Sequence, residues 1–237
     1  MKIFVFISLY LSLVWSLPAN QLVLTPRKAE GGRIIGGQVA YAGQYPFIAA
    51  IHKSTNEGNY FCGGNTLLDS QWVLTAGTCV DSATLFTIQL GLSNLKANEP
   101  STLTLATDEY FLHPEFNPNT LENDIGLIKF RMPITFTDYI RPINYLPNFR
   151  APPRYSRCVI AMGWGQTSMT ADLSDELQFV YLTPWSNEDC KFLYGSQLSN
   201  IWFVLAEITT KDFVWVSEVN LLCNYVEWIR NVTGLEK

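Results

Sequence analysis

The feature of this chain that most constrains its fold is a series of short β-like runs between Ile34 and Thr183. The runs are rich in β-branched and aromatic residues and are separated by Gly, Pro, Asn and Asp, a pattern typical of strands joined by turns. The clearest runs are Pro46–His52, Thr66–Thr75, Leu85–Gly91, Glu109–Leu112, Ile125–Phe130 and Cys158–Gly163. Strands of this length and spacing predict an all-β sandwich or barrel. Beyond them, Val226, Trp228 and Ile229 recur at helical spacing, so Tyr225–Val232 is predicted to form a short amphipathic helix.

The first 33 residues have the character of a leader. Lys2 precedes the apolar run Ile3–Trp15, which predicts a secretory signal peptide over residues 1–16. A membrane anchor is disfavoured, because spanning a bilayer takes about 20 apolar residues and this run is shorter and followed by Pro18. Residues 17–33 contain no cysteine and end in a basic residue, so they are predicted to be a propeptide. We therefore expect a secreted, extracellular protein.

Composition narrows the range of functions. The chain has 237 residues, of which 48% are hydrophobic and 14% aromatic, and this is enough apolar material for a sizeable core. Removing residues 1–33 takes away four basic residues and one acidic residue, which changes the net charge from −5 to about −8. An acidic protein is not expected to bind nucleic acid or an anionic membrane. The two isolated histidines, His52 and His113, suggest no metal site, and no cofactor motif is present.

Cysteines give a separate constraint. A secreted chain with five cysteines is expected to contain disulfides, and the odd number leaves at least one thiol unpaired or linked to another chain.

Several short strings carry a resemblance to a known family. They follow one another in that family's order over most of the chain, and so many matches in order are highly specific. The strings are Arg33-Ile34-Ile35-Gly36-Gly37, Cys62-Gly63-Gly64, Trp72-Val73-Leu74-Thr75-Ala76-Gly77-Thr78-Cys79, His113-Pro114, Asn123-Asp124-Ile125-Gly126-Leu127, Arg141-Pro142-Ile143, Gly163-Trp164-Gly165, Asn187–Cys190 and Tyr225-Val226-Glu227-Trp228-Ile229. Together they resemble the chymotrypsin-like (trypsin-like) serine proteases.

The resemblance implies a fold and several sites. The family fold is two antiparallel β-barrels with a short C-terminal helix, and we expect it over residues 34–237. Cleavage between Arg33 and Ile34 would correspond to the family's activation step. The resemblance also pairs Cys62 with Cys79 in a disulfide, and a loop of that order contributes about 3 kcal/mol in the chain-entropy model. Independently, Asn231-Val232-Thr233 matches the N-glycosylation pattern.

The catalytic residues of the family are only partly retained. In this family a histidine removes the proton of a serine hydroxyl, and an aspartate orients that histidine. Asp124 matches the aspartate, but the histidine position, directly before Cys79, holds Thr78. A threonine hydroxyl cannot act as a general base near neutral pH. His52 and His113 stand in other sequence contexts, so both are expected to be structural.

The serine region is missing altogether. No Gly-Asp-Ser-Gly-Gly string lies between Cys190 and Trp228, and none of Ser196, Ser199 and Ser217 has flanking glycines. The oxyanion hole, the base of the specificity pocket and the aspartate that receives the freed isoleucine amino group are lost with it. We therefore expect no measurable peptidase activity.

The second barrel is expected to be incomplete or remodelled, because residues from about 197 to 223 do not resemble the family. The family partners of Cys158 and Cys190 lie in the missing stretch, and Cys223 can bridge to only one of them. Ile201–Leu205 and Phe213–Val219, with the polar break Lys211-Asp212 between them, are predicted to form a hairpin that covers part of the exposed core.

Three hypotheses for function remain. The first is a secreted, non-catalytic homologue that binds a protease, an inhibitor or another polypeptide, with a thiol available for an intermolecular disulfide. The second is a serine endopeptidase of the same family, represented by a defective gene model or splice form. The third is a defective transcript with no stable product. A gene-model error at the C-terminal side would not account for Thr78, which lies inside a well-matched segment.

Overall fold

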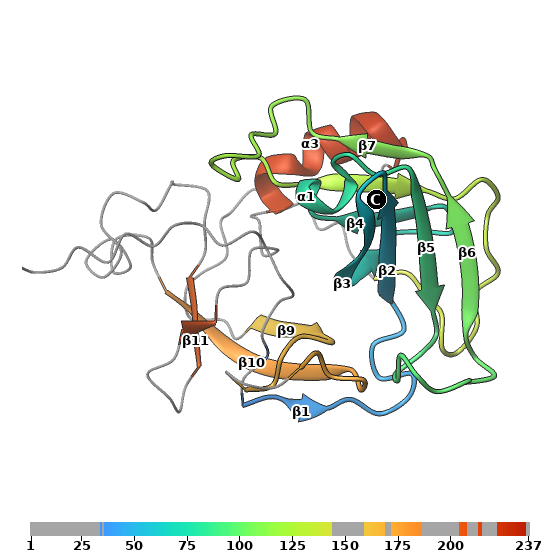
Figure 1. Cartoon of the computed structure of the whole chain (residues 1–237), viewed down its shortest axis with the longest axis vertical. Helices are drawn as coiled ribbons and strands as arrows, with labels where there is room; N and C mark the ends of the chain where they lie inside the picture. Colours follow the sequence, from blue (N-terminus) through green and yellow to red (C-terminus); the bar gives the residue numbers. More distant parts are fainter. Residues whose placement is uncertain are drawn as a thin grey trace, which may run out of the picture. The chain divides into compact units, whose positions relative to one another are not determined.

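The computed structural model describes residue 34 and residues 36–143, 159–168, 172–185, 204–207, 213–214 and 222–235. Most of the described elements are strands, and they form two antiparallel sheets (Figure 1). Two helices accompany them, the short α1 (Gly77–Val80) and α3 (Leu222–Thr233). This composition confirms the predicted all-β class with a short C-terminal helix.

The first sheet has seven strands and is the larger of the two sheets. Its spatial order is β6-β5-β2-β3-β4-β8-β7, so its two end strands, β6 and β7, are consecutive in the chain. Both ends meet at β8, since Thr107 Oγ1 donates to the Lys129 carbonyl at 2.7 Å and the Lys129 N–H donates to the Glu109 carbonyl at 3.0 Å. The sheet is therefore rolled. The strands are β2 (Ile48–Thr55), β3 (Gly58–Leu67), β4 (Trp72–Thr75), β5 (Leu85–Leu90), β6 (Leu103–Thr107), β7 (Tyr110–Leu112) and β8 (Gly126–Lys129).

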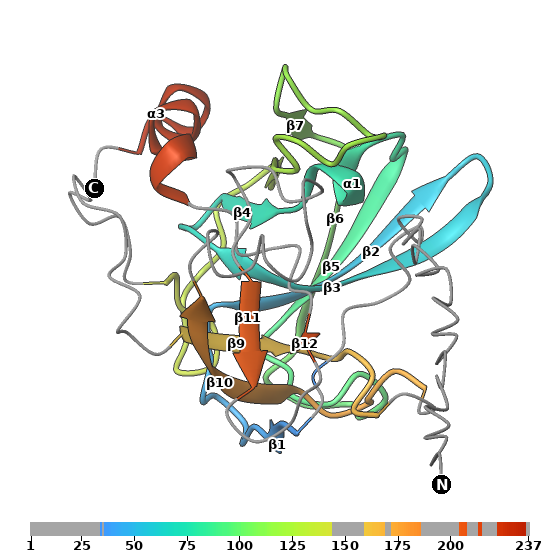
Figure 2. The ribbon, with the colours of Figure 1, turned by 90° about the vertical axis from the view of Figure 1, so that its left-hand side faces the viewer.

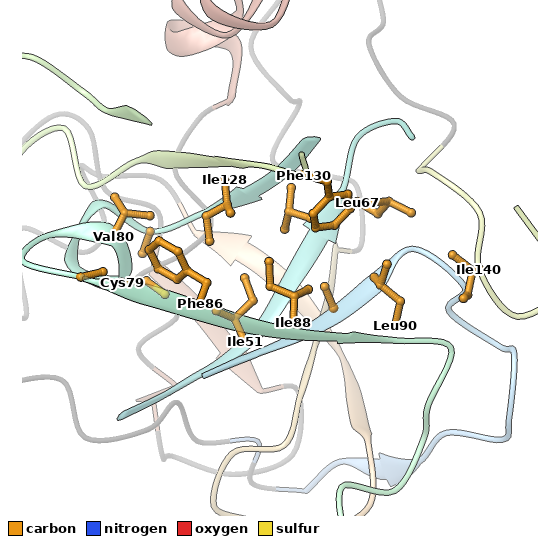
Figure 3. Packing of buried hydrophobic residues seen from close by; sticks show 14 residues of the cluster. Ile51, Leu67, Cys79, Val80, Phe86, Ile88, Leu90, Ile128, Phe130 and Ile140 are labelled. Atoms are coloured by element: carbon orange, nitrogen blue, oxygen red, sulfur yellow. The ribbon is translucent and has the colours of Figure 1, made fainter. Parts of the chain in front are cut away.

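The main hydrophobic core lies inside this rolled sheet. Alternate residues of β2 and β5 point inward, and the close-up in Figure 3 shows them meeting side chains from β3, β8 and α1. In β5 burial alternates because one face of the strand is buried. The first four residues of β2 are all buried, because Ala49 and Ile51 face this core while Ile48 and Ala50 face a second cluster. The labelled core residues are Ile51, Leu67, Cys79, Val80, Phe86, Ile88, Leu90, Ile128, Phe130 and Ile140.

The second sheet is organised around its longest strand, β10. It comprises β1 (Gln38–Val39), β9 (Val159–Gly163), β10 (Gln178–Trp185), β11 (Val204–Glu207) and β12 (Phe213–Val214). Strand β10 pairs with β9, β1 and β11, and β12 pairs with β11 (Figure 2). A second buried cluster connects this sheet to β2, because Ile48 and Ala50 pack with Trp164 and Phe179.

The predicted hairpin is present in part, since residues 201–203 and 215–219 lie outside the described residues. Strands β11 and β12 pair antiparallel through Leu205 with Val214 and Ala206 with Phe213. Strand β11 also joins β10, with Leu182 opposite Glu207 and Trp185 opposite Val204. Among the described residues the second sheet therefore has five strands.

One predicted strand is wrong in detail. The run Thr66–Thr75 is divided between β3 and β4, because a turn at Asp69 interrupts it. The Asp69 carboxylate accepts the N–H groups of Gln71 at 2.7 Å and Trp72 at 2.8 Å. Side-chain bonds of this kind hold a turn where an extended strand would leave both N–H groups to other partners.

Candidate active site

Thr78 and Asp124 are brought together at the end of the first sheet. Thr78 lies in α1, directly after β4, and Asp124 lies just before β8. The Thr78 N–H donates a hydrogen bond of 2.7 Å to Asp124 Oδ1, and the Thr78 hydroxyl donates one of 3.4 Å to Asp124 Oδ2. The two residues that match the family's histidine and aspartate positions are therefore direct neighbours.

Glycines permit this close approach. A Cβ atom at Gly126 would lie 2.6 Å from Cγ2 of Val80 and 3.2 Å from the carbonyl oxygen of Ala76. A Cβ atom at Gly77 would lie 3.1 Å from the backbone nitrogen of Ile125. A side chain at Gly126 would therefore collide with Val80 of α1, and one at Gly77 would require the backbone at Ile125 to shift by a few tenths of an ångström.

The Asp124 carboxylate is buried, with only 4% of the residue exposed. Burial raises the pKa of this carboxyl group, and the hydrogen bonds from the N–H and hydroxyl of Thr78 and the N–H of Gly77 offset only part of the rise. The arrangement supplies donors to the carboxylate, but position 78 offers no group whose pKa lies near neutral pH.

The turn before β8 is also fixed by α3. The Tyr225 hydroxyl donates to Asn123 Oδ1 at 3.2 Å, and Asn123 Nδ2 donates to the Glu115 carbonyl at 2.9 Å. Burial, and then the nearby Asp124 charge, raise the pKa of Tyr225. Tyr225 and Ile229 of α3 also belong to the same buried cluster as Ile125, the residue that follows Asp124. Helix α3 therefore holds the backbone that presents Asp124.

Lys53 is a neighbour of this site that sequence reasoning missed. Its Nζ donates to the carbonyl of Thr78 at 2.8 Å and to the carbonyl of Asp81 at 3.2 Å. A cation is favourable there because hydrogen bonds from a charged donor to carbonyl oxygens are stronger than those between neutral groups. Lys53 comes from β2, 25 positions before Thr78, and no local pattern in the sequence connects the two.

Both histidines pack against aromatic rings. The centroid of the His52 ring lies 4.9 Å from that of the Phe61 ring, and burial lowers the pKa of His52. The centroid of the His113 ring lies 5.4 Å from that of the Tyr225 ring and 5.1 Å from that of the Trp228 ring. Burial also lowers the pKa of His113, and the nearby Glu115 opposes this.

The remaining predicted site residues are spread over the domain. Cys62 and Cys79 form the disulfide that the resemblance implied. Ile34 is buried at the second sheet, and Asn231 is exposed on α3. Arg33, Cys158, Cys190 and the three candidate serines, Ser196, Ser199 and Ser217, lie outside the described residues, as does the side chain of Cys223.

Two further properties concern the described residues only. No group of three or more His, Cys, Asp or Glu side chains lies close enough together there to hold a metal ion. Neither of the two helices in these ranges is long and apolar enough to cross a membrane.

Comparison with known proteins identifies the family. The family model described as Trypsin matches residues 34–212. Brachyurin of Leptuca pugilator is 32% identical over 163 residues, which are 68% of this chain and 69% of that protein. Trypsin-1 of Salmo salar is 33% identical over 175 residues, which are 73% of this chain and 68% of that protein. The solved structure of HL collagenase covers 86% of this chain and 100% of its own with a TM-score of 0.72 and 25% identity. The chain therefore belongs to the trypsin family of chymotrypsin-like serine proteases.

Proposed function

We propose that this chain is a secreted member of the trypsin family that lacks peptidase activity and acts by binding another protein. The observation that carries the proposal is the contact between Thr78 and Asp124. The carboxylate that orients an imidazole in the family here accepts the N–H and the hydroxyl of a threonine. Without a base, a serine hydroxyl in this site would keep its proton and remain a weak nucleophile.

The sequence supports the same conclusion from the second half of the site. The chain contains no Gly-Asp-Ser-Gly-Gly string, so both the nucleophile and its flanking oxyanion-hole N–H groups lack a counterpart. Loss of triad members leaves only about 10³ to 10⁴-fold acceleration over water, and that remainder comes from the oxyanion hole and substrate binding. With the oxyanion hole also missing, the expected rate falls below this remainder.

Secretion is the second part of the proposal. It is supported by the apolar run Ile3–Trp15 after Lys2, and by the disulfide between Cys62 and Cys79, since disulfides persist in oxidising compartments. Binding is the third part. A folded domain that lacks the general base can still bind other proteins through its surface loops. The partner that we expect is a protease, a protease inhibitor or another polypeptide.

Activity assays test the first part. The purified full chain is incubated with a mixture of fluorogenic peptides and, separately, with a fluorophosphonate that labels active serines. We expect no hydrolysis and no label, and the same result for Thr78→His, because a restored base still has no serine to activate. Trypsin serves as the positive control. Labelling or hydrolysis that disappears in Asp124→Ala would overturn the proposal, and this variant separates true activity from a contaminating protease.

Binding needs its own assay. The immobilised chain is tested against trypsin-like proteases and against protein inhibitors of such proteases. Saturable binding to one of these classes at micromolar or lower concentration is the expected result. If neither class binds, the binding role as stated here is wrong.

The sequence of the messenger RNA distinguishes the competing hypotheses. Full-length RNA is sequenced across codon 78 and across the region from Cys190 to Tyr225. Thr78 with the present C-terminal region supports a remodelled, inactive homologue. Thr78 with a Gly-Asp-Ser-Gly-Gly form supports an inactive protein with two complete barrels. A histidine codon at position 78 together with the serine string would make this protein an ordinary serine endopeptidase.

A further inference from the structure

Two polar side chains are buried on the inner face of the first sheet. Asn65 of β3 is 4% exposed and Thr75 of β4 is 7% exposed. Each shares the face of its strand with an apolar residue of the main core, Asn65 with Leu67 and Thr75 with Val73. Both polar side chains therefore point into the rolled sheet.

The register of the strands places these two residues opposite each other. Strands β3 and β4 pair antiparallel, and the last pair of their ladder is Thr66 with Leu74. One further step in the same register brings Asn65 opposite Thr75. The two polar residues therefore lie at the point where β3 and β4 begin to separate.

Each of the two side chains keeps one polar atom without a hydrogen-bond partner. The amide nitrogen of Asn65 donates to the carbonyl of Gly63 at 3.0 Å and to that of Ala49 at 3.4 Å, so Oδ1 is the atom left to accept. Among the residues that the structure describes, neither Asn65 Oδ1 nor Thr75 Oγ1 has a partner, and both atoms are shielded from solvent. An unpaired buried polar atom is destabilising, so native proteins pair nearly all such atoms with protein groups or with ordered water.

We propose that one water molecule belongs to this core and bridges Asn65 Oδ1 and Thr75 Oγ1. Water fits because it donates to the amide oxygen and either accepts from the hydroxyl or donates to it. A water bridge joins atoms up to about 5.5 Å apart, since each of its hydrogen bonds is about 2.8 Å long. Opposed residues of antiparallel strands have Cβ atoms about 4.5–5.5 Å apart, which is within this reach.

A metal ion fits the same pair poorly. Hard cations take about six or more oxygen ligands, usually with carboxylates among them, whereas Asn65 and Thr75 supply two neutral oxygens. The chemistry of the pair therefore selects water.

The neighbours in the same row of the sheet are small and enclosed. Ala49 is opposite Asn65 and carries only a methyl group, and Gly126 is opposite Thr75. Val80 of α1 covers Gly126, because a Cβ atom there would lie 2.6 Å from its Cγ2. A polar, enclosed site with two or more hydrogen-bonding groups is the setting in which buried waters are found.

The water would support the candidate active site from beneath. Thr75 ends β4, which leads into α1 and Thr78, so a bridge from β3 to Thr75 holds the backbone that precedes Thr78. The inference goes beyond the proposed function, because Asn65 and Thr75 belong to the core whether or not the chain cleaves peptides. Either conclusion can fail without the other.

The change Thr75→Val tests the bridge, because valine keeps the shape of threonine and removes the hydroxyl. If water bridges the pair, it loses one of its two anchors, and the Tm should fall by about 2 °C or more. If the hydroxyl has no partner, its removal relieves a buried polar group. A Tm that stays constant or rises would therefore overturn the proposal.

Thr104→Val is the matched control, since Thr104 is exposed on β6. It makes the same chemical change outside the core, so it should shift the Tm by less than about 1 °C. An equal fall in Thr104→Val and Thr75→Val would show that the loss does not come from the buried site, and the proposal would fail.

A double-mutant cycle separates a bridge from two independent polar groups. Asn65→Ala removes the other anchor of the water. In that background Thr75→Val should lower the Tm by less than half as much as it does in the unaltered chain, because the bridge is already broken. Equal losses in the two backgrounds would mean that the groups act independently, which would overturn the proposal.

A high-resolution crystal structure of the full chain shows the site directly and does not depend on the folding of any variant. We expect a density peak at about 2.5–3.0 Å from both Asn65 Oδ1 and Thr75 Oγ1. A direct hydrogen bond between these two atoms with no such peak would overturn the proposal. A peak surrounded by about six oxygen ligands would also overturn it, because it would identify a cation instead of water.

Discussion

The backbone N–H of Thr78 donates a 2.7 Å hydrogen bond to Oδ1 of the buried Asp124, so a residue that matches a catalytic aspartate is held by a peptide group. Burial nevertheless raises the pKa of Asp124 above its unfolded value. The folded state then binds the proton more tightly than the unfolded state does. Asp124 is therefore expected to lower the stability of the domain at pH values above the unfolded pKa of about 3.9.

Asp124→Asn tests this directly. The amide keeps an acceptor for the Thr78 N–H and removes the buried charge, but its nitrogen no longer accepts the Thr78 hydroxyl. The free energy of unfolding at pH 7 should therefore rise by at most about 1.4 kcal/mol for each unit by which the folded pKa exceeds the unfolded pKa. The gain should shrink as the pH is lowered below the folded pKa toward 4, as measured by urea denaturation at several pH values.

Asp108→Asn is the matched control. Asp108 is exposed, and the hydrogen bond and charge of Arg131 lower its pKa, so its replacement should have a small effect of opposite sign. Loss of stability in Asp124→Asn at pH 7 would contradict the account, because it would mean that the ionised carboxylate is net favourable in this site.

Helix α3 should be a major source of stability for the first sheet. Ile229 is 1% exposed and packs in the cluster that contains Leu68, Trp72 and Ile125. Ile229→Ala should therefore lower the free energy of unfolding by about 2–5 kcal/mol. Glu227→Ala, at an exposed position of the same helix, should change it by less than about 0.5 kcal/mol. Similar effects of the two changes in urea denaturation would show that α3 is not packed on the sheet.

Much of the fold follows from the sequence because its elements are decided locally. The alternation in β5 and the helical spacing of Val226, Trp228 and Ile229 each place a strand or helix close to the observed limits. The strand expected at Thr66–Thr75 was wrong because a single carboxylate, that of Asp69, holds two N–H groups in a turn. The pattern of apolar residues carries no information about such a hydrogen bond.

The site was predictable to the extent that its residues belong to collinear motifs. The adjacency of Thr78 and Asp124 follows from the resemblance and is present in the structure. The contact between Lys53 and the Thr78 carbonyl was not predictable, because it depends on how β2 passes α1 in the rolled sheet.

Acidification should weaken the attachment of α3. Burial lowers the pKa of His113, whose ring packs on Tyr225 and Trp228. The neutral form is favoured in the folded state, so the free energy of unfolding should fall as the pH drops below the unfolded value of about 6.5 and continue to fall until the folded pKa is passed. Glu115 reduces the effect because its charge raises the same pKa.

A non-titrating variant isolates the contribution of His113. In His113→Asn the side-chain oxygen can still accept the Glu115 N–H, which Nδ1 of His113 accepts at 3.2 Å. The loss of stability between pH 7 and pH 5 should be smaller in this variant and smaller again when His52→Phe is added, since burial lowers the pKa of His52 as well. An unchanged pH dependence in the double variant would exclude the histidines as its source.

Asn231 is expected to carry an N-linked glycan when the chain passes through a secretory pathway. The side chain is exposed in the last turn of α3, so a glycan there would not disturb the packed face of the helix. Thr233 of the same motif donates its hydroxyl to the Ile229 carbonyl at 2.7 Å, so attachment should precede folding of the helix. Peptide N-glycosidase should reduce the mass of the secreted protein and leave that of Asn231→Gln unchanged. Secreted protein with no such mass loss would contradict the prediction.

The cysteines should separate into one structural pair and three others. Cys62 and Cys79 are linked across a separation of 17 residues, and the disulfide joins β3 to α1 close to Thr78. Peptide mapping without reduction should therefore recover these two cysteines linked to each other. Of the remaining three, at least one should react with iodoacetamide in the denatured protein or be found linked to another chain.

The Cys62–Cys79 bond should also carry measurable stability. Replacing both residues by alanine should lower the free energy of unfolding by about 3 kcal/mol, the value expected for a closed loop of this length. The effect should be seen without reductant and should vanish when the unaltered protein is reduced, because both proteins then lack the cross-link. Recovery of Cys62 or Cys79 linked to Cys158, Cys190 or Cys223 would contradict the pairing and, with it, the position of α1 beside Asp124.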